Sequence, residues 1–424
     1  MKYIIIGNSA AGIGAVEGIR AAEAACHIDK QGEITVISCE PHHTYSRPLI
    51  SYLLYGKVTD IKYRGESFYS ENNVSLLKGV TVITVDFHKK QLILSDGEKL
   101  SFDKLLVATG SSPFVPPFEG LDTVRDKFTF MSLDDARMLD EAIGNDREKR
   151  VLIIGAGLIG LKCAEGIAKK VSKITVADLA PRILSSILDD ESASIVQEHI
   201  ENKGIEFKLT SSVKKFNGNT AVFENGETVD FDVLVLAVGV RPNTSLLKDI
   251  TNIDRGIIVN SKSETSAKDI YAAGDCTQTL DISSGQNKIM ALLPNAYMQG
   301  ECAGINMVAS ATGAEVEKFF DKAIPMNAIG FFGLHMITAG NYVGDIYKEQ
   351  RIEHFINYKK LFYSDNTLNG YILIGNVEKA GIYTSLIRER TPLDSIDFAL
   401  VCEKPGLMAF TKEDRMVKLG GVKK

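Results

Sequence analysis

The sequence predicts an α/β protein with two Rossmann-like dinucleotide-binding domains, the second inserted in the first, and a small α+β C-terminal domain. An apolar run, Tyr3–Ile6, ends at the glycine-rich turn Gly7–Gly12, and a second run, Val151–Ile154, ends at Gly155–Gly160. A strand that stops at glycine turns tightly and brings backbone N–H groups to a pyrophosphate at a helix N-terminus. From about Val316 onward the pattern changes to alternating strands, which predicts the C-terminal domain.

An acidic residue completes each glycine unit. Glu40 closes the apolar run Ile34–Ile37, and Asp178 closes Ile174–Val176. A carboxylate at this place can accept both hydrogen bonds of an adenosine ribose. One such unit is weak evidence, because a glycine corner also serves strand-to-helix packing alone. Two complete units in one chain predict two dinucleotides bound at once.

The elements between and after the two units follow the same order of strands and turns. Short strands are expected at Val74–Val85 and Gln91–Leu94, and apolar strands at Leu105–Ala108 and Val233–Ala237. Pro113–Gly120 has the composition of a linker. The second unit is therefore expected to begin soon after residue 115.

A late strand and turn, Tyr271–Asp275, is similar to a piece of the first cofactor site, and a helix is expected from about Asn295 to Ala309. The second unit is therefore predicted to be inserted in the first. The expected domains are residues 1–115 with 245–315, residues 116–244, and residues 316–424. The C-terminal domain is expected to contain strands at Phe355–Phe362 and Leu368–Gly375.

Composition narrows the class of protein. The chain has 424 residues, 45% of them hydrophobic, and a net charge of −6, which argues against nucleic acid as the main ligand. No apolar run reaches the roughly 18 residues that span a bilayer. Six cysteines are scattered without paired spacing, which suits reduced thiols in a cytoplasm. Seven dispersed histidines predict no metal site.

The chain resembles the two-dinucleotide-binding flavoprotein family of pyridine nucleotide–disulfide reductases, NADH oxidases, ferredoxin reductases and NADH:rubredoxin reductases. The resemblance covers residues 1 to about 310. Its motifs are, in order, Gly7–Gly12 with Glu40, Ala108–Gly110, Gly155–Gly160 with Asp178, Val238–Asn243 and Tyr271–Asp275. It is closest to the branch that holds NADH:rubredoxin reductases, ferredoxin reductases and the flavin domain of NADH-dependent nitrite reductases.

The resemblance implies FAD in the first unit. Glu40 would hold the adenosine ribose, and Asp275 would bind the ribityl chain. The helix near Asn295 would point its positive N-terminus at the flavin O2 edge. Serine at the middle position of the glycine motif is small enough to be tolerated. The residues assigned to FAD are Gly7, Ser9, Ala10, Ala11, Gly12, Glu40, Arg47, Pro48, Val82, Thr109, Gly110, Gly274, Asp275 and Asn295.

The resemblance implies a nicotinamide cofactor in the second unit. Asp178 is followed by Leu179 and Ala180, so no cation stands there for a 2′-phosphate, and NADH is favoured over NADPH. Arg182 lies four residues on, but an arginine after proline does not signal NADP in this family. The residues assigned to this cofactor are Gly155, Gly157, Leu158, Ile159, Gly160, Asp178, Val238 and Gly239.

A redox cysteine is missing where the resemblance would place it. In the disulfide-reductase and peroxidase branches the thiol lies roughly ten residues past the ribose acid, and here Tyr45–Ser51 holds no cysteine. The second unit has no Cys-x-x-Cys either. Cys39 is expected to be a buried small hydrophobe, and Cys163 and Cys276 are also expected to be structural. Electrons are therefore expected to leave the flavin without a thiol relay.

Arg47 and Lys162 are the candidate catalytic residues. Tyr45–Pro48 resembles the Arg-Pro signature of the rubredoxin, ferredoxin and nitrite reductase branch, so Arg47 is expected to face the flavin or its phosphates. The alternative is a surface arginine in a salt bridge. Lys162 replaces a glutamate that many relatives carry near the nicotinamide. It would adjust hydride transfer or pair with a carboxylate, and the alternative is an exposed helix lysine.

The predicted function is an FAD-dependent NADH oxidoreductase that passes electrons to a small iron carrier protein, rubredoxin first and ferredoxin second. The alternatives are an NADH oxidase, the flavin subunit of a larger nitrite- or sulfite-type reductase, and a redox-signalling flavoprotein. Phe331 and Phe332 are expected in the C-terminal core. The basic C-terminal tail would steer an acidic carrier or be simply solvated; its cations are Lys412, Arg415, Lys418, Lys423 and Lys424.

Overall fold

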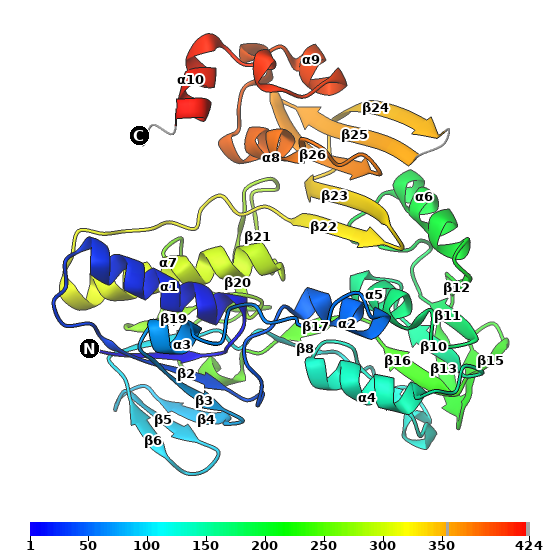
Figure 1. Cartoon of the computed structure of the whole chain (residues 1–424), viewed down its shortest axis with the longest axis horizontal. Helices are drawn as coiled ribbons and strands as arrows, with labels where there is room; N and C mark the ends of the chain where they lie inside the picture. The colour runs from blue at the N-terminus through cyan, green and yellow to red at the C-terminus, as the bar shows by residue number, and fades with distance from the viewer. Residues whose placement is uncertain (353–355, 421–424) are drawn as a thin grey trace. The chain divides into compact units, whose positions relative to one another are not determined.

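A computed structural model describes residues 1–352 and 356–420, which form two compact units (Figure 1). Unit 1 comprises Met1–Leu179, Ile205–Leu280 and Asn287–Asp321. Unit 2 comprises Ala180–Gly204, Asp281–Gln286 and Lys322–Lys424. Among the described residues, no helix has the length and apolarity to cross a membrane.

The first sheet of unit 1 has the strand order β19-β7-β1-β2-β3, and all its neighbours run parallel. Its strands are β1 (Lys2–Ile6), β2 (Glu33–Ser38), β3 (Val74–Lys78), β7 (Lys104–Val107) and β19 (Ile270–Ala272). Because β19 follows the second nucleotide unit in the sequence, the sheet is completed by a strand from beyond an insertion. The predicted insertion is therefore confirmed.

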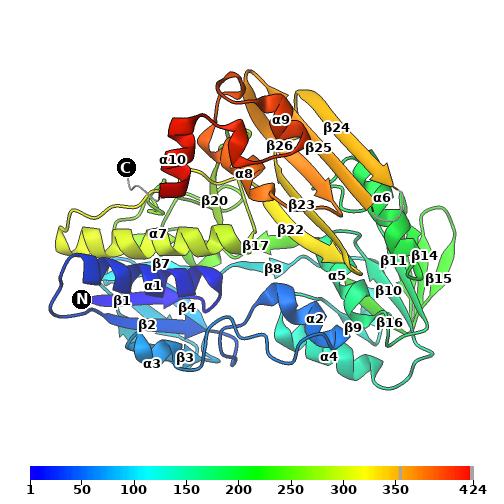
Figure 2. The ribbon, with the colours of Figure 1, turned by 45° about the horizontal axis from the view of Figure 1, so that its top comes forward.

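Helices cover one face of this sheet and a small sheet covers the other. Helices α1 (Ala10–Ala25) and α7 (Leu293–Thr312) run side by side, as Figures 1 and 2 both show. Ile5 and Val36 are buried with these helices, whereas Ile4 and Ile37 are buried on the opposite face. The opposite face carries β4 (Val82–Asp86), β5 (Gln91–Leu94) and β6 (Lys99–Ser101).

The contact between α1 and α7 is made by backbone. A Cβ atom at Gly14 would lie 2.3 Å from the carbonyl oxygen of Tyr297, and one at Gly300 would lie 2.0 Å from that of Ala11. Any side chain at these positions would force the helices apart. The glycines thus fix how close the two helices come.

The strand expected at Val74–Val85 is wrong as one element. It is divided into β3 and β4, which belong to different sheets. Gly79 lies between them with φ +70°, in the left-handed region that favours glycine, and Gly79 turns the chain from one sheet to the other. The expected linker begins at β8 (Ser111–Pro113), which pairs antiparallel with β17 (Val240–Pro242).

The second sheet of unit 1 repeats the Rossmann arrangement. Its order is β12-β11-β10-β16-β9, again with parallel neighbours. The strands are β9 (Lys127–Phe128), β10 (Arg150–Ile154), β11 (Lys173–Ala177), β12 (Ile205–Lys208) and β16 (Val233–Leu236). Helices α4 (Leu133–Ile143) and α5 (Leu158–Ile167) belong to this half, with β13 (Val213–Asn217), β14 (Thr220–Phe223) and β15 (Thr228–Asp230).

Shorter elements complete unit 1 and its borders. The helical ones are η1 (Arg47–Leu49), α2 (Ile50–Tyr55), α3 (Phe68–Glu71), η2 (Leu121–Thr123) and η3 (Ser245–Leu247). The strands are β18 (Ile257–Ile258), β20 (Thr277–Asp281) and β21 (Gln286–Lys288).

Unit 2 is an α+β unit built on the antiparallel sheet β22-β23-β26-β25-β24. Its strands are β22 (Met326–Phe331), β23 (Leu334–Gly340), β24 (Asp345–Ile352), β25 (Ile356–Ser364) and β26 (Thr367–Ile374). The expected strands at Phe355–Phe362 and Leu368–Gly375 correspond to β25 and β26, and Phe355 lies outside the described residues. Phe331 is buried, as expected, whereas Phe332, in the turn between β22 and β23, is only partly buried.

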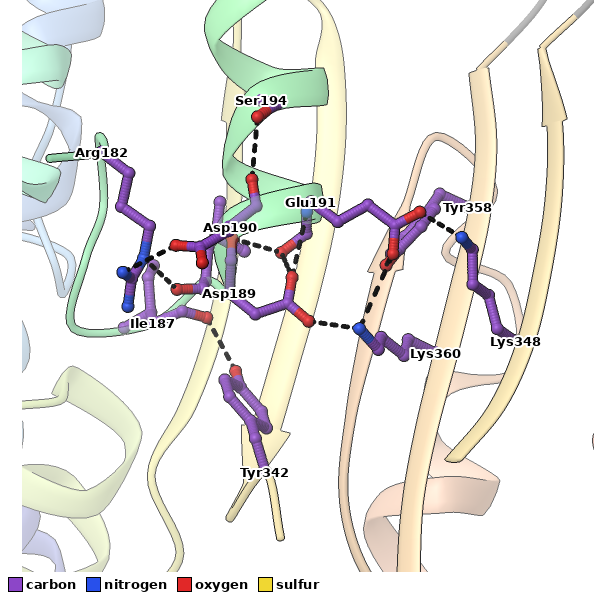
Figure 3. Close-up of polar contacts among 12 residues, drawn as sticks. Arg182, Ile187, Asp189, Asp190, Glu191, Ser194, Tyr342, Lys348, Tyr358 and Lys360 are labelled. Atoms are coloured by element: carbon purple, nitrogen blue, oxygen red, sulfur yellow. Dashed lines mark hydrogen bonds and ion pairs between the residues drawn. The ribbon is translucent and has the colours of Figure 1, made fainter. Parts of the chain in front are cut away.

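Helix α8 (Ala380–Glu389) packs against this sheet, and residues of α9 (Phe398–Glu403), η4 (Leu393–Ser395) and η5 (Leu407–Ala409) are buried in the same core. The other helices of unit 2 are α6 (Asp190–Glu201) and α10 (Lys412–Gly420). Figure 3 shows the N-terminal carboxylates of α6 facing lysines of β24 and β25. Lys360 Nζ lies 2.6 Å from Asp189 Oδ2, and Lys348 pairs with Glu191. The crossover from β11 to β12, which contains α6, therefore belongs to unit 2.

Candidate functional site

The first glycine turn is fixed by close backbone packing. Gly7 has φ +125°, and a Cβ there would lie 2.1 Å from the Ala108 carbonyl oxygen. A Cβ at Gly12 would lie 2.0 Å from the carbonyl oxygen of Gly7. Ser9 caps α1 in an extended conformation, and the first turn of the helix holds no acidic residue. The N–H groups of Ala10 and its neighbours are therefore available to an anion at the helix N-terminus.

The predicted ribose acid is held by two side chains. Tyr45 donates its hydroxyl to Glu40 Oε2 at 2.6 Å, and the Arg47 guanidinium donates to Oε1 of the same carboxylate. Arg47 also donates to the carbonyl oxygen of Met131 at 3.0 Å, and the N–H of Leu133 donates to Tyr45 Oη. Arg47 thus contacts the predicted ribose acid and the other Rossmann half.

Burial opposes the charge on Arg47, but Tyr45 and Glu40 outweigh it and raise the pKa of the guanidinium. The cation therefore stays charged beside Glu40 at every physiological pH. Pro48 follows Arg47 in the short helix η1 (Arg47–Leu49), and its ring restricts the backbone there. The side chain of Val82 is buried in the apolar core with Ile37 and Leu94, and a contact of this residue with FAD stays a prediction.

A second group of predicted FAD residues lies where β7, β17 and the turn after β19 meet. Thr109 Oγ1 donates to the carbonyl oxygen of Asn243 at 2.7 Å, and Asn243 Nδ2 donates back to the carbonyl of Thr109. Ser111 Oγ lies 3.3 Å from Asp275 Oδ2. Burial raises the pKa of the Asp275 carboxyl, and Ser111 and Arg47 offset this only in part. Arg47 and Asp275 therefore interact electrostatically.

Several buried polar atoms in this half have no hydrogen-bond partner among the described residues. They include His43 Nε2, Thr44 Oγ1, Ser51 Oγ and Gln299 Nε2. Gln299 lies on α7 one turn after Asn295, and its Oε1 accepts the N–H of Gly274 at 2.8 Å. Such atoms are costly without a partner, so a polar ligand here would satisfy them. The sequence carried no signal for Tyr45, Thr44, Ser51 or Gln299 as site residues.

The second glycine turn leaves open the space that a pyrophosphate needs. A Cβ at Gly155 would lie 2.2 Å from the Ala237 carbonyl oxygen, and one at Gly160 would lie 1.9 Å from that of Gly155. At Gly157, the N-cap of α5, a Cβ would meet no atom within 4 Å. Leu158 and Ile159 form the first turn of α5. The N-terminus of α5 is thus packed closely against the sheet at Gly155 and Gly160, and it leaves space for a ligand at Gly157.

The second acid reaches back to this turn. Asp178 Oδ2 accepts the N–H of Ala156 at 2.6 Å. Gly239 follows Val238 in the segment between β16 and β17. It has φ +121°, and a Cβ there would meet no atom within 4 Å. Arg182 is engaged within unit 2, where it bonds Asp190 at 2.9 Å and the carbonyl of Leu188 (Figure 3). The structure thus joins the predicted nucleotide acid to the glycine turn.

Lys162 is not the exposed helix lysine of the alternative interpretation. Its side chain is 14% exposed, and its ammonium pairs with Glu165, which is 2% exposed. The ammonium also lies 4.2 Å from the ring centroid of Tyr52 on α2. The expectation that Lys162 pairs with a carboxylate is therefore met, whereas its catalytic role stays a prediction.

The cysteines divide into buried and exposed thiols. Cys163 and Cys276 are buried, as expected, and burial raises the pKa of Cys276 to about 11 and that of Cys163 further still. The expectation for Cys39 is wrong, because this thiol is exposed. Strand β2 ends at Ser38, so Cys39 lies one residue beyond the part that the sheet buries. Among the described residues, no group of His, Cys, Asp and Glu side chains could hold a metal ion.

Part of the predicted basic tail can be placed. Lys412 and Arg415 lie on α10, near the end of the described chain. Lys423 and Lys424 lie outside the described residues. The steering role of the tail stays a prediction.

Comparison with known protein families identifies the family of this chain with two predicted dinucleotide sites. The profile described as pyridine nucleotide-disulphide oxidoreductase matches residues 1–300. The chain belongs to this family. Members of the family use FAD and NADH, and the chain is an NAD(P)H-dependent oxidoreductase. The two glycine turns, their acids and the unsatisfied polar atoms fit two such cofactors.

Relatives within the pyridine nucleotide-disulphide oxidoreductase family differ in activity. The epsilon subunit of an NADH-dependent phenylglyoxylate dehydrogenase of Aromatoleum evansii is 29% identical over 92% of both chains. An NADH oxidase of Methanocaldococcus jannaschii is 31% identical over 88% of both. A rubredoxin–NAD(+) reductase of Pseudomonas putida is 28% identical over 74% of this chain and 82% of its own length.

The fold is also that of solved members. The reductase in a covalent putidaredoxin reductase–putidaredoxin complex superposes with a TM-score of 0.84, at 21% identity over 99% of both chains. The predicted fold class is confirmed by this likeness and by the family profile.

Proposed function

We propose that this protein is an FAD-dependent NADH oxidoreductase that passes electrons from NADH through the flavin to a small iron carrier protein, rubredoxin or ferredoxin. The proposal rests on one observation. Tyr45–Ser51, where disulfide-reducing relatives carry a redox thiol, holds instead Arg47, which is paired with Glu40. Buried thiols elsewhere have raised pKa values. Cys163 and Cys276 are therefore poor relays for a pair of electrons, which favours an acceptor that takes electrons directly from flavin.

The residues of the chain would bind and orient the two cofactors. Bound FAD supplies the chemistry of a two-electron acceptor that can release single electrons. The N-termini of α1 and α5 would hold the pyrophosphates, and Glu40 and Asp178 would hold the adenosine riboses. Asp275 would bind the ribityl chain, and the positive end of α7 would favour negative charge on the reduced flavin.

Hydride transfer needs placement more than an acid or base. Two contacts within unit 1 support a fixed placement of the two halves. Strands β8 and β17 pair across the halves, and α2 packs on α5 so closely that a Cβ at Gly166 would lie 3.1 Å from the Ser51 carbonyl oxygen. The ion pair of Arg47 with Glu40, extended to the Met131 carbonyl, adds a third link.

A second candidate is the electron-transfer subunit of a larger enzyme. The epsilon subunit of the phenylglyoxylate dehydrogenase covers 92% of both chains, which supports it. The rubredoxin–NAD(+) reductase supports a free carrier. The NADH oxidase relative supports oxygen as the acceptor instead.

The test is turnover of the FAD-loaded protein with NADH and a panel of acceptors. We expect slow NADH oxidation in air and a sharp rise with rubredoxin or ferredoxin. The same rise should survive Cys39→Ser, which removes the exposed thiol nearest the ribose acid. If both carriers leave the rate unchanged while oxygen sustains it, the protein is an oxidase. A charge-transfer band that Cys39→Ser abolishes would restore the disulfide-reductase class.

A further inference from the structure

Three lysine ammonium groups contact two tyrosine rings where α2 meets α5. Lys57 Nζ lies 4.9 Å from the ring centroid of Tyr52 and 4.6 Å from that of Tyr55. Lys169 Nζ lies 4.2 Å from the Tyr55 centroid, and Lys162 Nζ lies 4.2 Å from the Tyr52 centroid. These five residues are called the tyrosine–lysine patch.

The patch presents positive charge outward. Glu165 pairs with Lys57 at 3.3 Å and with Lys162, but its side chain is only 2% exposed, so its charge lies beneath the surface. Lys57 is 41% exposed, and Lys169 is exposed and forms no ion pair within the described part of the chain. The whole chain carries a net charge of −6. An outward cationic patch on an acidic protein is a local attraction for an acidic partner.

The patch adjoins the segment that replaces the redox thiol of relatives. The short helix η1, which contains Arg47, leads directly into α2, which ends at Tyr55. Six helical residues span roughly 9 Å, so the patch and Arg47 lie at the two ends of one short segment. Arg47 in turn interacts electrostatically with Asp275, the predicted ribityl ligand. A partner on the patch would therefore sit over the segment that leads to the predicted flavin.

We propose that the tyrosine–lysine patch is the docking surface for the electron carrier, and that it binds a small protein through carboxylates on that protein's docking face. The inference rests on the proposed function and adds the place and chemistry of recognition. Tyrosine is enriched in protein interfaces because it brings a large, stiff surface with a polar tip. The ring contacts also hold the lysines in place, which lowers the entropy lost on docking.

The alternative is that the patch only braces α2 against α5. Close packing there already comes from the small residue Gly166, where an added Cβ would lie 3.4 Å from Leu54 Cβ. Lys169 extends beyond this packed contact, since its ammonium reaches only the Tyr55 ring. Lys169 therefore distinguishes the two interpretations. If the patch only holds α2 against α5, Lys169 contributes to stability; if the patch is a docking surface, Lys169 contributes its charge.

The experiment compares Lys169→Glu with the unchanged protein, using rubredoxin and a neutral quinone as alternative acceptors. Docking predicts that kcat/KM for rubredoxin falls about tenfold at low salt, while NADH-to-quinone turnover and the melting temperature stay unchanged. The dependence of the rubredoxin rate on ionic strength should also flatten. For Lys169→Gln, kcat/KM for rubredoxin should lie between the values of Lys169→Glu and of the unchanged protein. Lys30→Glu is the matched control, because Lys30 is exposed just before the start of β2, within the first sheet's half of unit 1.

The other outcomes would contradict the docking surface, the proposed function, or both. If the unchanged protein reduces rubredoxin and Lys169→Glu does so equally well, the docking surface is overturned and the proposed function stands. If Lys169→Glu lowers the melting temperature and quinone turnover together, the patch is a brace. If neither rubredoxin nor ferredoxin is reduced by the unchanged protein, the proposed function and the docking surface both fall. An equal loss in Lys30→Glu would point to net charge alone and overturn the docking surface.

Discussion

Tyr45 donates its hydroxyl hydrogen to Glu40 Oε2 across 2.6 Å, while its own oxygen accepts the N–H of Leu133 at the start of α4. The phenol therefore connects the predicted ribose acid of one Rossmann half to a helix of the other. Arg47 occupies the second oxygen of the same carboxylate. Glu40 is thus oriented before any ligand arrives, which lowers the cost of ordering it on binding.

Tyr45→Phe should weaken FAD binding without loss of fold. The bond is present without FAD, so its loss acts on Kd through the cost of ordering Glu40 on binding, about 1 kcal/mol, and the FAD Kd should rise about fivefold. Titration of the apoprotein with FAD, followed by flavin fluorescence, measures it. Tyr363→Phe in unit 2 is the control. An unchanged Kd in Tyr45→Phe together with a raised Kd in Glu40→Gln would mean that Glu40 acts without this orientation.

Two glycines of the second turn should respond in opposite ways to alanine. Gly160→Ala places a Cβ 1.9 Å from the Gly155 carbonyl oxygen and should destabilise the protein by about 3 kcal/mol. Gly157→Ala meets no atom within 4 Å, so the melting temperature and FAD content should hold. Because the new methyl group would occupy the pyrophosphate space, KM for NADH should rise at least about tenfold. Equal KM values would place the pyrophosphate elsewhere.

Asp178 should set the preference for NADH. A carboxylate repels a 2′-phosphate, and its bond from Ala156 N–H holds it at the turn. Asp178→Asn should therefore narrow the ratio of kcat/KM for NADH and NADPH by roughly tenfold, equivalent to about 1.4 kcal/mol. Steady-state kinetics with both cofactors and a neutral quinone measures this ratio. Equal or better kcat/KM with NADPH in the unchanged protein would contradict the assignment.

The acidic end of α6 should make unit 2 sensitive to acid (Figure 3). Burial raises the pKa of Asp189, but hydrogen bonds from Lys360 and Ser192 outweigh it and hold the pKa below its usual value. A lowered folded pKa gives stability that is present above the unfolded pKa, near 4, and lost as pH falls through the folded value.

Lys360→Met should therefore cost unit 2 about 1 kcal/mol at pH 7 and very little at pH 2. Hydrogen exchange of the α6 amides at the two pH values follows this unit alone. Lys404→Met, an exposed lysine near the end of α9, is the control. A cost that is the same at both pH values would mean that Lys360 acts through packing of its stem.

Local motifs predicted the two nucleotide halves well, because each glycine turn and its acid depend on a few neighbouring residues. The position of Cys39 was missed because the end of a strand varies by a residue or two, and that residue decides exposure. The bonds of Tyr45 with Leu133 and of Lys162 with Tyr52 could not be predicted. They join segments about 90 to 110 residues apart, and only the tertiary fold brings them together.

The place of α6 shows the same limit. Helix α6 lies in the crossover from β11 to β12 of the second sheet. Its charged N-terminus nevertheless pairs with lysines of β24 and β25, more than 150 residues later in the chain. Acidic residues at a helix N-terminus are common for reasons of dipole alone, so nothing in this turn indicates distant partners.

The bare backbone contact of α1 with α7 also bears on how the chain is made. Helix α1 leaves the ribosome early, whereas α7 begins at Leu293, after the entire nicotinamide half. At roughly 5–20 residues per second, α1 waits for tens of seconds before its glycine face is covered. During synthesis the nicotinamide half can close on itself first, while the first sheet still lacks β19 and its second helix. The apolar face that α1 shares with α7 therefore stays uncovered until the later part of the chain has been made.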